Sequence, residues 1–110
     1  MRTRDKNLSD YGIDCGRAAE LMEHARLEEN KGYICKAADI SNPGLSAFII
    51  ESLTQKRGYD RIYIKSYIPA KRDDFYAYRR KALALFSLLL EGKTPIIPRD
   101  RRIQRKFTHS

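Results

Sequence analysis

The chain has 110 residues, which fits one small domain plus a tail and leaves too little chain for a large enzyme pocket. Hydrophobic residues make up 42% of it and charged residues 33%, and no apolar run reaches the roughly 18 residues that predict a membrane-spanning helix. The formal net charge is +8, and no apolar segment follows the basic N-terminus, so we expect a cytoplasmic protein without a secretory signal.

The N-terminal third predicts one amphipathic helix. Residues 1–10 are polar, and we expect them to be flexible. Asp14 is a residue type favoured at the N-cap, and helical spacing of apolar residues continues from there to about Asn30. Gly32 is expected to end this helix by taking the left-handed conformation.

The middle of the chain predicts two more helices. A short helix is expected over residues 33–40. Ser41 or Asn42 would cap the next one, with Pro43 at its first position, where the missing N–H costs nothing. Gly58 is expected to terminate that helix.

Residues 59–68 fit two interpretations. Their content of tyrosine and isoleucine favours a strand. If the segment is a helix, five of its residues fall at the spacing that places them on one side of it: Tyr59, Ile62, Tyr63, Ser66 and Tyr67. A lone strand has no partner for its hydrogen bonds, so we predict a short helix, which Pro69 ends.

The last predicted helix begins at Asp73 or Asp74, whose carboxylates suit a first turn, and closes at Gly92. Helical spacing gives it a core stripe of Phe75, Tyr78, Ala82, Leu85, Phe86 and Leu89. It places away from that stripe Arg72, Tyr76, Arg79, Arg80, Leu83 and Ser87. We therefore predict an all-α domain of four to five helices over residues 11–92 and a flexible basic tail over residues 93–110.

The sequence offers no catalytic motif. It contains no glycine-rich phosphate loop, GxSxG or HExxH. The adjacent pair Asp73 and Asp74 cannot share a site on a helix, because neighbouring side chains point about 100° apart. We therefore expect the protein not to be an enzyme.

The cysteines do not predict a metal site either. Cys15 and Cys35 are far apart and belong to no CxxC pair, so we expect reduced thiols. Zinc bound by these two with His24 is conceivable, but the spacing matches no ligand pattern. We expect no metal and no cofactor.

Positive charge is concentrated in the C-terminal half. Residues 1–30 carry five Lys/Arg against seven Asp/Glu, whereas residues 93–110 carry six against one. Such a distribution predicts a polyanionic partner, with nucleic acid first and an anionic membrane surface second. The alternative is that these cations only make the surface soluble.

The layout of residues 59–92, two helices separated by a tight break, is that of a helix-turn-helix. In such a motif the second helix enters the major groove of DNA by its N-terminal turns. The cations of the last helix lie in those turns, so we predict DNA contacts from Lys71, Arg72, Tyr76, Arg79 and Arg80. Tail residues that would add phosphate contacts are Arg101, Arg102 and Arg105.

Three stretches carry a resemblance to a known family: YGID near the N-terminus, SLTQKRGYDRI, and IPAKRDDFYAYRRKALALFSLL. Over residues 10–92 the chain resembles small phage and prophage proteins of Gram-positive bacteria related to late-gene transcription activators of the RinA/ArpU type. The resemblance implies a sigma-factor-like helix-turn-helix, with residues 59–67 as its first helix. It also implies a bacterial host cytoplasm, and DNA-facing positions at Arg72, Tyr76, Arg79 and Arg80.

These observations predict a transcriptional regulator that reads double-stranded DNA. RNA polymerase or a second copy of the chain are further candidate partners, through the helix of residues 14–30 and the side chains of Leu83 and Leu90; a membrane is not expected. One rival is a phage interaction protein that inhibits a host nucleic-acid enzyme, of the anti-CRISPR type. Another is a packaging component that binds DNA without sequence preference.

Overall fold

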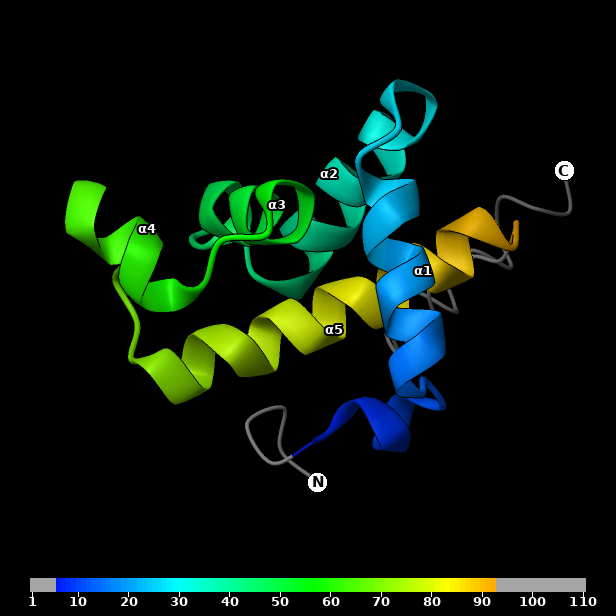
Figure 1. Cartoon of the computed structure of the whole chain (residues 1–110), viewed down its shortest axis with the longest axis horizontal. Coiled ribbons are helices and arrows are strands. Elements are labelled where there is room, and N and C mark those ends of the chain that lie inside the picture. The colour runs from blue at the N-terminus through cyan, green and yellow to red at the C-terminus, as the bar shows by residue number, and fades with distance from the viewer. Residues whose placement is uncertain (1–5, 93–110) are drawn as a thin grey trace, which may run out of the picture.

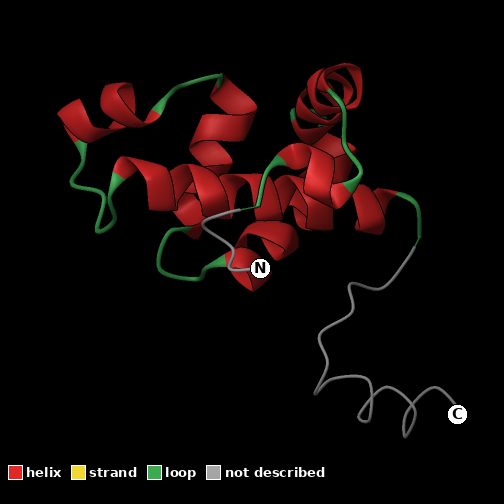
Figure 2. Ribbon diagram, turned by 90° about the horizontal axis from the view of Figure 1, so that it is seen from below, coloured by secondary structure: helices red, strands yellow, loops and turns green. Residues whose placement is uncertain are grey.

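The computed structural model describes residues 6–92, and within this range it contains helices and no strands (Figure 2). The five α-helices are α1 (Cys15–Ala25), α2 (Lys31–Ser41), α3 (Ser46–Gln55), α4 (Tyr59–Lys65) and α5 (Arg72–Leu90). Two 3-10 helices, η2 (Leu8–Tyr11) and η3 (Glu28–Asn30), precede α1 and α2. The prediction of a small all-α domain is confirmed. None of the described helices is long and apolar enough to cross a membrane.

The central element is α5 (Figure 1). The first helix, α1, crosses its C-terminal half, α2 and α3 pack against it, and α4 lies beside its N-terminal end. One continuous core joins these helices, and its largest fully buried members include Leu21, Ile34, Ile49, Phe75 and Phe86. Each such side chain contributes about 1.5–3 kcal/mol by leaving water, so packing against α5 stabilises helices too short to persist alone.

More of α5 is buried than helical spacing predicts. Phe75, Ala82 and Phe86 are buried as expected. Leu83 is only 2% exposed and Ser87 is also buried, so the prediction that these two lie away from the core is wrong. The reason is that α1 covers a second side of α5, where the Arg17 guanidinium lies 3.3 Å from Ser87 Oγ. Leu83 is therefore not available to a partner.

The N-terminal third begins as predicted and then breaks early. The Asp14 side chain caps α1 by accepting a 2.7 Å hydrogen bond from a backbone N–H in the first turn. The helix ends at Ala25, and the carbonyl of His24 in its last turn accepts a 2.9 Å hydrogen bond from the buried Asn30 side chain beside one of 3.1 Å from the Leu27 N–H. A new helix, α2, runs through Gly32, so the prediction that Gly32 ends a helix is wrong.

The connection from α2 to α3 also differs from the prediction. Ser41 belongs to α2, and its hydroxyl donates a 2.7 Å hydrogen bond to the Tyr78 carbonyl of α5. The Asn42 side chain closes a turn by accepting from Gly44 N at 2.9 Å. Because α3 begins only after this turn, the predicted helix start at Pro43 is wrong.

The junction of α3 and α4 uses a different residue as terminator. Lys56, with φ of 55°, takes the left-handed conformation after α3, whereas Gly58, with φ of −83°, is the N-cap of α4. The prediction that Gly58 terminates a helix by its backbone freedom is therefore wrong. Its small size matters instead, because a Cβ there would lie 3.0 Å from the hydroxyl of Tyr76.

The prediction that the ambiguous segment is helical is confirmed for Tyr59–Lys65. Ile62 is buried against the rest of the fold, and the Tyr59 ring packs 5.6 Å from the Phe75 ring of α5. The helix ends at Lys65, ahead of Pro69. Tertiary packing thus overrides the β propensity of this segment.

Candidate nucleic-acid interface

The side chains of α5 that were predicted to face DNA do not share one exposed face. Lys71, the N-cap residue, and Arg72, the first residue of the helix, are both exposed. The Nη2 atom of Arg72 lies 2.6 and 2.8 Å from the two carboxylate oxygens of Asp60 in α4. These two cations therefore stand where α4 and α5 meet.

Tyr76 holds α4 against α5. Its hydroxyl accepts a 2.9 Å hydrogen bond from the backbone N–H of Tyr59, the first residue of α4. That N–H has no partner within its own helix, so the bond satisfies an open helix end. The Tyr59 hydroxyl in turn donates a 2.6 Å hydrogen bond to the Ala70 carbonyl. The structure thus places the polar end of Tyr76 inside the helix junction.

Arg79 is turned toward the core. Its guanidinium lies 5.7 Å from the centre of the Tyr76 ring, and Nη2 lies 4.0 Å from the sulfur of Met22 in α1. Within residues 6–92 no hydrogen-bond acceptor reaches its buried Nε. Burial lowers the pKa of the Arg79 guanidinium below its usual value, although Tyr76 acts in the opposite direction. The structure therefore places this charge at a partly buried position between α5 and α1.

Arg80 also forms a hydrogen bond within the described part of the chain. Its Nε donates a 2.7 Å hydrogen bond to the carbonyl of Lys6, just before η2. Beyond the first two residues of α5, no residue from 74 to 90 is more than partly exposed. The first turn of α5 is therefore the part of this helix that is open to a large ligand. The predicted tail contacts Arg101, Arg102 and Arg105 lie outside the described residues.

The most exposed large side chains beside that turn belong to α4 and the residues after it. We define the α4 surface as Arg61, Tyr63, Ile64, Lys65 and Tyr67, all of which are exposed. Ile64 is 82% exposed and Tyr67 71% exposed, which is unusual for side chains of this size. Because Ile62 is buried, the helical turn places Ile64 on the opposite, solvent side of α4.

Three tyrosines form a series along one side of α4. The ring centres of Tyr59 and Tyr63 are 5.5 Å apart, and those of Tyr63 and Tyr67 are 5.7 Å apart, with edge-to-face geometry in the second pair. Contacts of this kind favour a fixed arrangement of the rings. The inner end of the series is anchored by the hydrogen bonds of Tyr59, whereas its outer end reaches solvent at Tyr67.

The charge is positive over residues 59–72, and two acids, Asp73 and Asp74, follow in the first turn of α5. Residues 59–72 contain four Lys/Arg and one acid, Asp60, which is paired with Arg72. Asp73 follows in the first turn of α5 and is exposed. Exposed cations beside exposed aromatic rings can bind phosphates and stack bases, as single-stranded nucleic-acid sites do.

Sequence reasoning placed the interface on α5 and missed the α4 surface. The available signal was the helical spacing of Tyr59, Tyr63 and Tyr67, but the same spacing fits a buried stripe. Only the structure shows that Ile62 packs into the core while Ile64 and Tyr67 face solvent.

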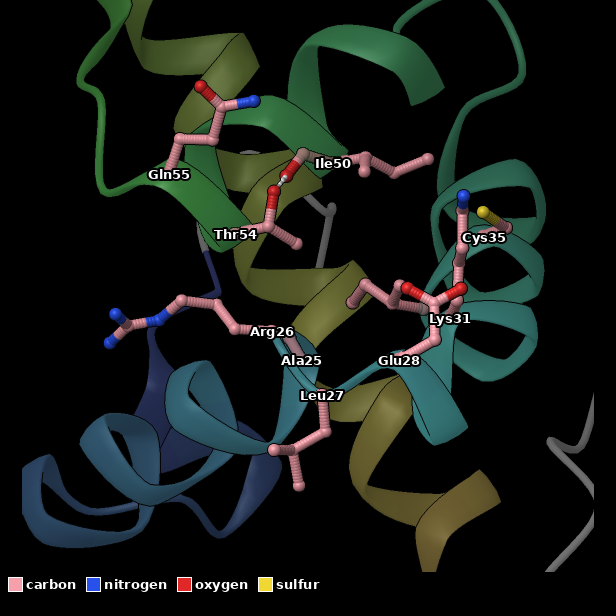
Figure 3. A pocket seen from close by; sticks show the side chains of 10 residues that line it. Ala25, Arg26, Leu27, Glu28, Lys31, Cys35, Ile50, Thr54 and Gln55 are labelled. Carbon is pink, nitrogen blue, oxygen red and sulfur yellow. Dashed lines mark hydrogen bonds between the residues drawn. The ribbon is translucent and has the colours of Figure 1, made fainter.

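A groove lies elsewhere, between the end of α1, η3, α2 and α3 (Figure 3). This groove has a volume of about 380 Å³ and an apolar wall that includes Ala25, Ile34 and Ile50. Arg26 extends on one side of it, and Lys31 stands on the other side. The Thr54 hydroxyl donates a 2.7 Å hydrogen bond to the Ile50 carbonyl within α3.

Metal-binding side chains do not cluster in the described part of the chain, where no group of three or more His, Cys, Asp or Glu could hold an ion. Cys15 is exposed and Cys35 is partly buried, and neither forms a disulfide. Comparisons with family models, curated proteins and solved structures found no match to this chain.

Proposed function

We propose that the chain is a DNA-binding transcriptional regulator of phage or prophage type, which contacts double-stranded DNA through the α4 surface and the first turn of α5. The observation that carries this proposal is the excess of cations over residues 59–72, exposed together at one end of the fold. Lysine and arginine side chains bind DNA phosphates and release counterions, which supplies much of the affinity.

Arg72 is available for this role although it is paired. Its side chain is 59% exposed and that of Asp60 is 70% exposed. An ion pair so open to water is worth about 0–1 kcal/mol. Arg72 can therefore exchange the carboxylate for a phosphate at little cost in stability.

The junction of α4 and α5 supports a defined docking geometry. Two hydrogen bonds of Tyr59, to Tyr76 and Ala70, fix α4 on the start of α5. In a helix-turn-helix, the N-terminal residues of the second helix contact base edges. Here that role falls to residues 71–73 together with α4. The tail residues Arg101, Arg102 and Arg105 would add phosphate contacts.

A second candidate is a phage interaction protein that inhibits a host nucleic-acid enzyme. The observation that favours it is the exposure of Ile64 and Tyr67, since exposed apolar side chains gathered on one surface often mark a protein contact.

The test is a selection of random duplex DNA on the full chain, followed by salt titration of binding. The variant Arg61→Ala/Lys65→Ala removes two cations of the α4 surface. The matched control, Lys31→Ala/Lys36→Ala, removes two exposed cations of α2. We expect the wild-type chain to enrich a DNA motif. The plot of log affinity against log salt should become shallower by about two units of slope in the first variant only.

Equal slopes in the two variants would place the DNA contact elsewhere on the chain. Binding without a motif would favour the non-specific packaging role. Absence of duplex binding at physiological salt would refute the proposal and favour the interaction protein.

A further inference from the structure

Phosphate contact does not explain the apolar part of the α4 surface. Arg61 and Lys65 suit phosphates, but Ile64 has no polar group and is 82% exposed. It stands on the solvent side of α4 between these cations and the tyrosine series. An exposed isoleucine there lowers solubility and gains nothing from the DNA backbone.

The tyrosine rings offer surfaces that a flat apolar partner can cover. Tyr63 is 43% exposed although the Tyr59 and Tyr67 rings both contact it, and Tyr67, at the outer end of the series, is 71% exposed and is the more open ring. Nucleic-acid bases are flat and stack on aromatic side chains with little regard to sequence. Bases inside an intact duplex have their faces covered by neighbouring pairs, so only unpaired bases can stack on these rings.

We infer that the α4 surface binds unpaired bases of an opened DNA duplex. The bases stack on Tyr63 and Tyr67 and contact Ile64, while Arg61 and Lys65 hold phosphates of the same strand. The match of charge and aromatic surface to a single strand carries this assignment. It rests on the proposed DNA binding and deepens it, because it names the form of DNA that this surface takes.

The experiment compares two DNA probes of identical sequence on one strand, one fully paired and one with a short mismatched bubble. Fluorescence anisotropy at fixed salt measures the affinity of the full chain for each. We expect the wild-type chain to bind the bubble about tenfold more tightly, as expected from stacking of single bases. Tyr67→Ala should bring the ratio of the two affinities close to one, and Ile64→Ser should lower it.

Two variants separate stacking from other roles of the ring. Tyr67→Phe keeps the aromatic face and should retain the preference for the bubble. Tyr33→Ala, at a tyrosine of α2 that is 46% exposed, should leave the ratio unchanged. Because Tyr67 is largely exposed, its replacement should not unfold the domain, which circular dichroism verifies.

The remaining outcomes either refute the inference or support it. Equal affinity of the wild-type chain for both probes, or an unchanged ratio in Tyr67→Ala, refutes the inference while duplex binding stands. Loss of binding to both probes in Arg61→Ala/Lys65→Ala, with the bubble preference intact in the wild type, supports both proposals. No binding of the wild-type chain to either probe refutes both proposals and favours the interaction protein.

Discussion

The substitution Tyr76→Phe tests whether Tyr76 has a structural role or contacts DNA. It removes only the hydroxyl group. That oxygen accepts a 2.9 Å hydrogen bond from the Tyr59 N–H, and both residues are partly buried. A hydrogen bond of this type contributes about 0.5–1.5 kcal/mol to stability. The free energy of unfolding should therefore fall by about 1 kcal/mol, which corresponds to a Tm lower by about 4–8 °C in a domain of this size.

The assay is thermal unfolding followed by circular dichroism, beside the anisotropy measurement on duplex DNA. Tyr33→Phe is the matched control, because it removes a hydroxyl from an exposed tyrosine of α2 and should leave Tm unchanged. DNA affinity measured well below Tm should change little in Tyr76→Phe. An unchanged Tm together with a tenfold loss of DNA affinity would show that Tyr76 faces DNA and that the placement described above is wrong.

Two further substitutions test other parts of the structure. Asn30→Ala removes the side chain that donates to the His24 carbonyl, so we expect a loss of about 1 kcal/mol in chemical denaturation; no loss would show that this bond does not set the end of α1. Arg79→Met replaces a partly buried guanidinium, whose buried Nε has no acceptor within residues 6–92, by an apolar chain of similar length. Because burial of the charge is costly, we expect Tm to stay constant or rise with DNA binding retained, whereas a drop in affinity at constant Tm would assign Arg79 to the interface.

The existence of most helices could be predicted because their signals are local. Asp14 caps its helix through a backbone contact in the first turn, and the core stripe of α5 begins with Phe75 as spacing predicts. The ends of the helices could not be predicted in the same way. Gly32 continues a helix, and Lys56 takes the left-handed turn that glycine usually supplies. These ends depend on contacts such as the hydrogen bond from Asn30 to the His24 carbonyl. Such a bond stabilises the fold because the groups that form it are at least partly buried.

The candidate interface shows the same division. The concentration of cations after residue 58 is visible in the sequence, and Lys71 and Arg72 are exposed as a DNA contact requires. Tyr76, Arg79 and Arg80 were predicted to accompany them, but their polar ends contact other parts of the fold. Helical spacing shows which residues lie on the same side of α5. It does not show how many of these sides other helices cover.

The sequence by itself determined that this protein is helical, that it is basic toward its C-terminus and that its last helix carries a core stripe. Helix caps and helical periodicity involve residues that are close in the sequence, and composition needs only the sequence, so all three can be recognised without a structure. Only the tertiary structure decided that α5 is enclosed on several sides and that α4 presents Ile64 and Tyr67 to solvent. That decision depends on which helices pack together, because burial of an apolar face is a property of the whole fold and not of the segment that carries it.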